Sequence, residues 1–93
     1  MKIKTKVVKE EWYLPYDAND ELGIEIIEDN IIDNNRWSII HELIVKIQDK
    51  FYKTDYCVGA TEYQDEQPWQ DDNYVEFTEV KKVQKIVEIW EEV

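Results

Sequence analysis

The chain has 93 residues, of which 43% are hydrophobic and 13% aromatic, and its formal net charge at pH 7 is -11. This length suits one domain, residues 1–93, with a modest core, and the apolar content excludes a chain that is disordered throughout. The negative charge argues against direct binding to nucleic acid or to an anionic membrane surface, because both would repel the protein.

The cysteine content and the first residues predict a protein of the cytoplasm. Cys57 is the single cysteine, so it cannot form an internal disulfide. The N-terminal segment continues after Lys9 with Glu10 and Glu11, where a signal peptide would have an apolar run. No aliphatic stretch approaches the roughly 18 to 20 residues that a membrane-spanning helix requires.

The first third of the chain predicts strands separated by an extended segment. Residues 2–9 alternate apolar and polar side chains and predict a strand, and residues 12–16 are expected to be extended because they contain Pro15. Residues 23–33 are rich in isoleucine, which we expect to lie in the core. They predict either one strand or a short hairpin that turns at Asp29 and Asn30.

Residues 37–58 carry the clearest pattern, a central β-hairpin. Every second residue from Trp37 to Ile47 fits one face of a strand, and the many β-branched side chains favour a strand over a helix. A two-residue turn at Asp49 and Lys50 would leave residues 51–58 as the returning strand. The facing pairs on one side would be Ile47/Tyr52, Val45/Thr54, Leu43/Tyr56 and His41/Val58, with Lys46 facing Lys53 on the other.

The last third is less regular. Residues 64–73 contain Pro68 and predict a loop, and residues 74–81 predict a strand. The spacing of the apolar residues in 83–93 fits a helix, whereas their high content of β-branched residues fits a strand, and we favour the strand. We therefore predict a mainly β fold, a small antiparallel sheet with the hairpin at its centre and little helix. The alternative is an α+β fold with a C-terminal helix.

No pattern in the sequence indicates catalysis, a cofactor or a metal. Two glycines are too few for a phosphate-binding loop, and the predicted hairpin places His41 and Cys57 on opposite faces, which separates the residues of a cysteine–histidine dyad. The acids of residues 65–76 and the run Glu79-Val80-Lys81 resemble a metal-dependent nuclease site only faintly. We expect a protein that is not an enzyme and needs no cofactor.

Acidic residues are concentrated in two blocks. Residues 10–33 contain nine acids and residues 61–80 contain seven, and neither block contains a lysine or an arginine. Such blocks form either a solvated face without function or an electrostatic surface for a basic partner. Carboxylates on one face of a strand recur about every 6.6 to 6.8 Å, which is close to the spacing of every second phosphate on a DNA strand.

The later block also interleaves aromatic rings with the acids, as protein interfaces do when rings anchor a partner and carboxylates steer it. The alternative is that these rings only cover the edge of the sheet. We prefer this block to residues 10–33, whose isoleucines are expected to be buried. The predicted partner-binding residues are Glu62, Tyr63, Asp65, Glu66, Trp69, Asp71, Asp72, Tyr74 and Glu76.

Residues 51–69, FYKTDYCVGATEYQDEQPW, resemble a segment of small uncharacterised acidic proteins from bacteriophages and prophages of Gram-positive bacteria. The resemblance implies a phage protein that acts in the cytoplasm of the host, and it assigns no functional residue. Together with the charge, it predicts an inhibitor that imitates DNA and binds a basic, nucleic-acid-binding host protein, such as a CRISPR, restriction or repair enzyme. The alternative is a structural or accessory phage protein that self-associates, for example as a homodimer.

Overall fold

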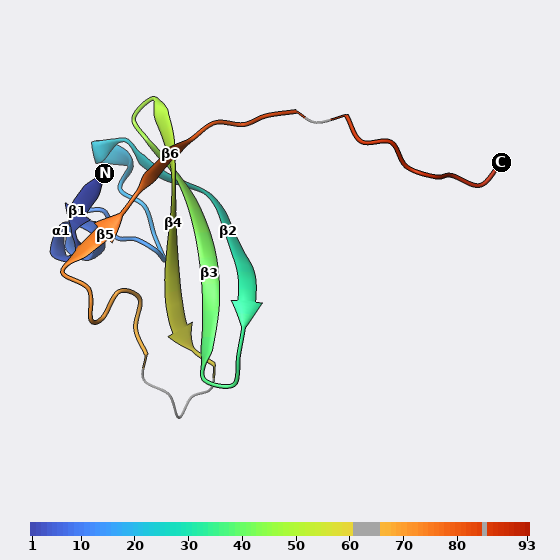
Figure 1. Cartoon of the computed structure of the whole chain (residues 1–93). Helices are drawn as coiled ribbons and strands as arrows, with labels where there is room; N and C mark the ends of the chain where they lie inside the picture. The colour runs from blue at the N-terminus through green and yellow to red at the C-terminus, as the bar shows by residue number, and fades with distance from the viewer. Residues whose placement is uncertain (61–65, 85) are drawn as a thin grey trace.

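The computed structural model describes residues 1–60, 66–84 and 86–93, and in them the fold is mainly β, as predicted (Figure 1). A four-stranded antiparallel sheet has the order β2-β3-β4-β6, and a two-stranded sheet pairs β1 with β5. The strands are β1 Lys2–Lys4, β2 Ile24–Asn34, β3 Ser38–Ile47, β4 Lys50–Gly59, β5 Tyr74–Glu76 and β6 Thr78–Val80. The helices are short: α1 is Thr5–Glu10, and the 3-10 helix η1 is Asp20–Leu22.

The hairpin of β3 and β4 is confirmed, but its turn lies one residue earlier than predicted. Ile47 pairs with Lys50, so the turn is Gln48 and Asp49. Gln48 has a φ of 57°, the left-handed conformation that a tight two-residue hairpin turn requires. Glutamine is not a residue type typical of this position, so the sequence did not indicate it. Lys46 consequently faces Phe51 instead of Lys53. The like-charge pair expected from the sequence does not form.

Strand β2 is one continuous strand at the edge of the sheet, so the alternative of a hairpin at Asp29 and Asn30 is wrong. Its pairing with β3 shifts between Ile26 and Glu28 and again between Ile31 and Asp33. Each shift is a β-bulge, which reverses the faces to which the following side chains point. Bulges and charges on an edge strand also oppose pairing with another strand.

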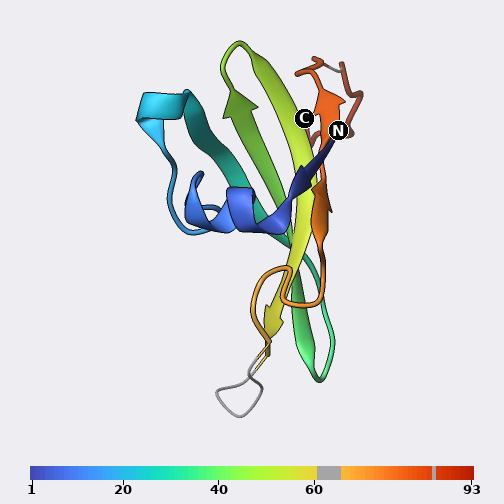
Figure 2. The same cartoon turned by 90° about the vertical axis from the view of Figure 1, so that its left-hand side faces the viewer.

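The core lies on one face of the four-stranded sheet. Figure 2 shows α1 crossing that face, and residues 66–77 contribute Trp69, Val75 and Phe77 to the same apolar cluster. Gly23, which lies between η1 and β2, has a φ of 73°, and its carbonyl accepts a hydrogen bond from the Gln48 N–H in the hairpin turn. The buried apolar side chains are Val8, Leu14, Ile24, Leu43, Val45, Tyr56, Trp69, Val75 and Phe77.

Two predicted strands are divided in the structure. The strand expected at residues 2–9 ends at Lys4, where it stops pairing with β5, and continues as α1, which buries Val8 completely. Tertiary burial thus outweighs the low helix propensity of the two valines. The strand expected at residues 74–81 breaks at Phe77, a core residue, and its two halves pair with different sheets.

Neither expectation for the C-terminus is borne out. Residues 81–84 and 86–93 form neither a strand nor a helix, and the chain runs away from the sheet after β6 (Figure 1). The Cα radius of gyration is 15.9 Å, against roughly 12 Å for a compact chain of this length. The projecting end of the chain contributes to this excess.

Candidate functional site

The candidate site lies along the outer edge of β4. Strand β6 pairs with β4 only from Phe51 to Lys53, so the rest of this edge faces residues 66–76 instead of a strand. Two hollows of about 370 and 220 Å³ lie there, and Asp55, Trp69 and Asp72 line both of them. We call the residues around the hollows the acidic surface, which consists of Asp55, Glu66, Asp71, Asp72, Tyr74 and Glu76.

Trp69 lines both hollows but is not an exposed anchor. Only 7% of it is exposed, and its ring lies 5.7 Å from the Tyr56 ring. The indole Nε1–H donates a hydrogen bond of 2.9 Å to the Asp55 carbonyl on the β4 edge. The prediction that Trp69 is a surface anchor is therefore wrong, and the alternative, in which a ring covers the sheet edge, describes Trp69.

Asp71, Asp72 and Tyr74 are exposed beside Trp69, as a binding surface requires. The Asp72 N–H donates to the Trp69 carbonyl and closes the turn that presents the two aspartates. Tyr74, at the start of β5, is 54% exposed and offers an aromatic ring at the rim of the larger hollow. The predicted residues Glu62, Tyr63 and Asp65 lie outside the described residues.

The remaining two predicted acids already have partners within the chain. Ser38 Oγ donates a hydrogen bond of 2.6 Å to Glu66 Oε1, and the N-terminal ammonium lies 3.2 Å from Glu76 Oε1. The ammonium offsets the charge of Glu76, whereas the neutral hydroxyl of Ser38 orients Glu66 and leaves its charge in place. Asp55 was missed by the sequence reasoning because it lies in a stretch of balanced charge, although its place between two core-facing residues of β4, Thr54 and Tyr56, predicts an outward carboxylate.

The negative charges converge at Cys57. Burial raises the pKa of the Cys57 thiol, and the carboxylates of Glu66, Asp55 and Asp72 raise it further. A thiol in this field stays protonated and is a poor nucleophile. In the β3–β4 pairing, Cys57 faces Ile40 while His41 faces Tyr56, so His41 and Cys57 lie on opposite faces of the sheet.

The expected row of carboxylates along one strand is not formed in the described residues. Asp71 and Asp72 lie in a turn, Asp55 lies on β4, and Glu76 lies on β5. The prediction that the isoleucines of residues 10–33 are buried is also wrong in part, because Ile27, Ile31 and Ile32 of β2 are exposed. Of the β2 isoleucines, only Ile24 is fully buried, and Ile26 is half-buried.

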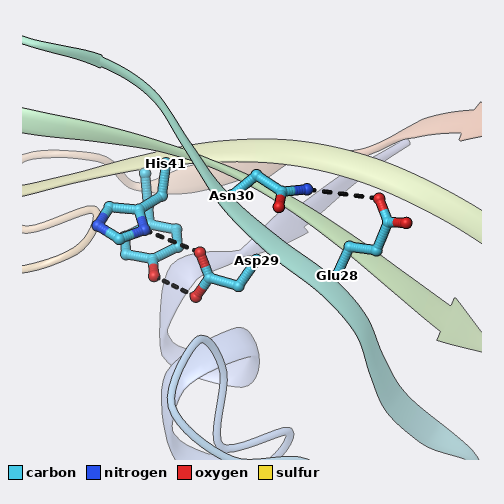
Figure 3. A network of polar contacts seen from close by, with 5 residues as sticks. Glu28, Asp29, Asn30 and His41 are labelled. Carbon is cyan, nitrogen blue, oxygen red and sulfur yellow. Dashed lines mark hydrogen bonds and ion pairs between the residues drawn. The ribbon is translucent and has the colours of Figure 1, made fainter.

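A second polar cluster, on the core face of the sheet, joins three strands. Asp29 of β2 accepts a 2.5 Å hydrogen bond from Tyr56 Oη through Oδ2, and its Oδ1 lies 2.8 Å from His41 Nδ1 (Figure 3). The β-bulge after Ile26 turns Asp29 towards this face. A separate contact in Figure 3 joins Asn30 and Glu28 at 3.4 Å.

The contact between Asp29 and His41 resembles a catalytic acid–histidine pair, but the geometry of the cluster indicates a structural role. The His41 and Tyr56 rings stack with centroids 4.6 Å apart, and both oxygens of Asp29 are occupied. Burial, followed by the hydrogen bond to Asp29, raises the pKa of the Tyr56 phenol, so the hydroxyl stays protonated. We interpret the cluster as a cross-strand support that holds Tyr56 against Trp69 beneath the acidic surface.

In the described part of the chain, no three His, Cys, Asp or Glu side chains gather as metal ligands. Across the same residues, no helix combines the length and the apolar character needed to cross a bilayer. Comparison with protein-family models, with curated proteins and with solved structures finds no match to this chain. The resemblance of residues 51–69 to phage proteins therefore stays a prediction.

Proposed function

We propose that this protein is not an enzyme but an inhibitor, and that its acidic surface occupies the nucleic-acid-binding groove of a basic partner protein. One observation carries the proposal. Carboxylates from β4 and from the segment that follows it line the same two hollows, and those of Asp55, Glu66 and Asp72 all lie near enough to Cys57 to raise the pKa of its thiol. A net charge of -11 extends this field and would accelerate encounter with a basic protein.

The hollows suit long cationic side chains. A lysine or arginine of the partner entering either hollow meets the carboxylates of Asp55 and Asp72 beside an aromatic wall. Tyr74 can cover the apolar stem of such a side chain in the larger hollow. Lys53 also lines this larger hollow, and its positive charge opposes the entry of more than one cationic side chain.

The basic proteins most available inside a cell are those that bind nucleic acid, and their grooves already bind anions at close spacing. The resemblance to phage proteins supports a partner in a bacterial host, such as a CRISPR, restriction or repair enzyme. In this role the aspartates of the 69–72 turn and Asp55 replace phosphate groups individually, because they do not form a regular row.

The test is affinity capture from a nuclease-treated bacterial lysate, followed by release of the captured proteins with duplex DNA. We expect basic proteins to be captured by the parent chain, to be lost at high salt and to be displaced by the DNA. The variant Asp71→Lys/Asp72→Lys should lose them. Captured proteins that DNA does not displace would contradict the proposal.

A matched control separates the acidic surface from the total charge. Glu10→Lys/Glu11→Lys changes the net charge by the same amount at two exposed positions at the C-terminal end of α1, and neither residue lines the hollows. This control should capture the same proteins as the parent. If it loses them as completely as the variant in the 69–72 turn, binding depends on total charge and the proposed surface is wrong.

A further inference from the structure

The C-terminal segment, residues 81–93, exposes several large apolar side chains to solvent. Ile86 and Trp90 are fully exposed, and Val83, Val87 and Ile89 are largely exposed. These side chains recur at three- and four-residue steps, a spacing that places most of them on one side of the segment if it becomes helical. An exposed apolar run of this kind indicates a binding element whose partner is absent.

The sheet has an uncovered apolar region on the face opposite the core. There, Ile27, Ile44, Phe51 and Val80 line a hollow of about 490 Å³, which we call the outer groove. In the β3–β4 pairing, Ile44 and Phe51 alternate with core residues, so their side chains point away from the cluster that contains α1 and residues 66–77. Ile27 and Phe51 are both exposed at this groove.

Charges around the outer groove match those of the C-terminal segment. Glu28 and Glu42 lie on its β2–β3 side, while Lys53, Lys81 and Lys82 lie on its β4–β6 side. The segment itself starts with lysines and ends with acids, Glu88, Glu91 and Glu92. The acidic end of a segment from another copy can therefore lie beside Lys53, Lys81 and Lys82.

The geometry of β6 directs the segment to another molecule and not back onto its own groove. Residues 78–93 contain no Gly, Pro, Asn, Asp or Ser, the residues that form tight turns. After Val80 the next pairing position would bring Lys81 against Lys50, the first residue of β4, beyond which lies the hairpin turn. The chain accordingly continues outward from the sheet (Figure 1).

We infer that the C-terminal segment docks in the outer groove of a second copy of this chain. Reciprocal exchange of two segments gives a closed two-fold dimer, in which the acidic end of each segment meets Lys81 and Lys82 of the other copy. Pairing with the β2 edge is less suitable because two bulges interrupt it. None of the residues that make up the acidic surface lines the outer groove.

The test compares the mass in solution of the full-length chain and two double variants across a wide concentration range. The parent chain should reach twice its 11.3 kDa mass as concentration rises. Ile86→Ser/Trp90→Ser should weaken the dimer about 30-fold or more, because two anchors are lost. The control Ile31→Ser/Trp37→Ser changes the same residue types at exposed positions outside the groove and should dimerise like the parent.

Mixing two variants tests the exchange itself. Ile27→Ser/Phe51→Ser damages the groove and keeps the segment, whereas Ile86→Ser/Trp90→Ser damages the segment and keeps the groove. At a concentration where the parent chain is dimeric, each variant should be monomeric alone, and together they should form a mixed dimer through the single intact contact. A parent chain that is monomeric at every concentration overturns the inference, even if Trp90 fluorescence shows a buried ring, since that result means docking within one molecule. A segment variant that dimerises like the parent also overturns it.

Discussion

Replacing Trp69 with phenylalanine tests whether this side chain supports the fold, as its burial indicates. The variant loses the hydrogen bond from Nε1 to the Asp55 carbonyl, which costs about 1 kcal/mol of unfolding free energy. The smaller ring also leaves part of the space beside Tyr56 empty, at a further cost of about 1 kcal/mol. We therefore expect a loss of about 2 kcal/mol in total.

Urea unfolding followed by far-ultraviolet circular dichroism measures this loss, since the signal does not depend on the tryptophan that is removed. With a slope near 1 kcal/mol per molar urea for a domain of this size, the midpoint should fall by about 2 M. Trp37→Phe is the matched control, because Trp37 is 61% exposed, and it should change the free energy by less than about 0.5 kcal/mol. Equal stability of the two variants would refute the assignment of Trp69 to the core.

Two further predictions concern the support beneath the acidic surface, and a third concerns the contact of Gly23 with the hairpin turn. Asp29→Ala should lower the free energy of unfolding by about 2 kcal/mol in urea titrations, because Tyr56 and His41 lose a shared acceptor that is only partly screened by solvent. The raised pKa of Tyr56 means that the folded state favours the protonated phenol, so the stability that this group contributes is complete below about pH 10 and is lost as the pH rises above it. In unfolding measurements from pH 8 to 11, Tyr56→Phe should therefore lose less stability at alkaline pH than the parent chain. An identical alkaline decline in both proteins would contradict this prediction. Gly23→Ala should cost about 1 to 2 kcal/mol, since φ is 73° and the new Cβ would lie 3.3 Å from Gln48 Cγ, and a variant with the parent's melting temperature would exclude this strain.

The sheet could be predicted where side chains alternate strictly, as in residues 37–58. The turn could not, because placing Gln48 in a left-handed conformation depends on the neighbouring Gly23 and not on the local residues. Residues 5–10 form a helix that buries Val8 in the core, and the local alternation of apolar and polar residues does not predict this packing. Tertiary contacts decide both cases.

The candidate site was partly predictable for a similar reason. Charge concentration identified Asp71 and Asp72, and the interleaved aromatic rings identified Tyr74; all three are exposed. Composition could not show that Trp69 is buried or that Asp55 joins the site, because both facts depend on how residues 66–73 return to the edge of β4. The bulges in β2, which expose isoleucines expected in the core, likewise arise from pairing and not from composition.

The central claim is that the aspartates of the 69–72 turn steer a basic partner to the acidic surface. The most direct measurement is the association rate constant with a captured, purified partner at several salt concentrations, for the parent chain, Asp71→Lys/Asp72→Lys and Glu10→Lys/Glu11→Lys. Removing steering charges at the binding surface should slow association about tenfold or more at low salt and flatten its salt dependence, and the control should stay close to the parent. Equal slowing by both variants, or none by either, would contradict the account.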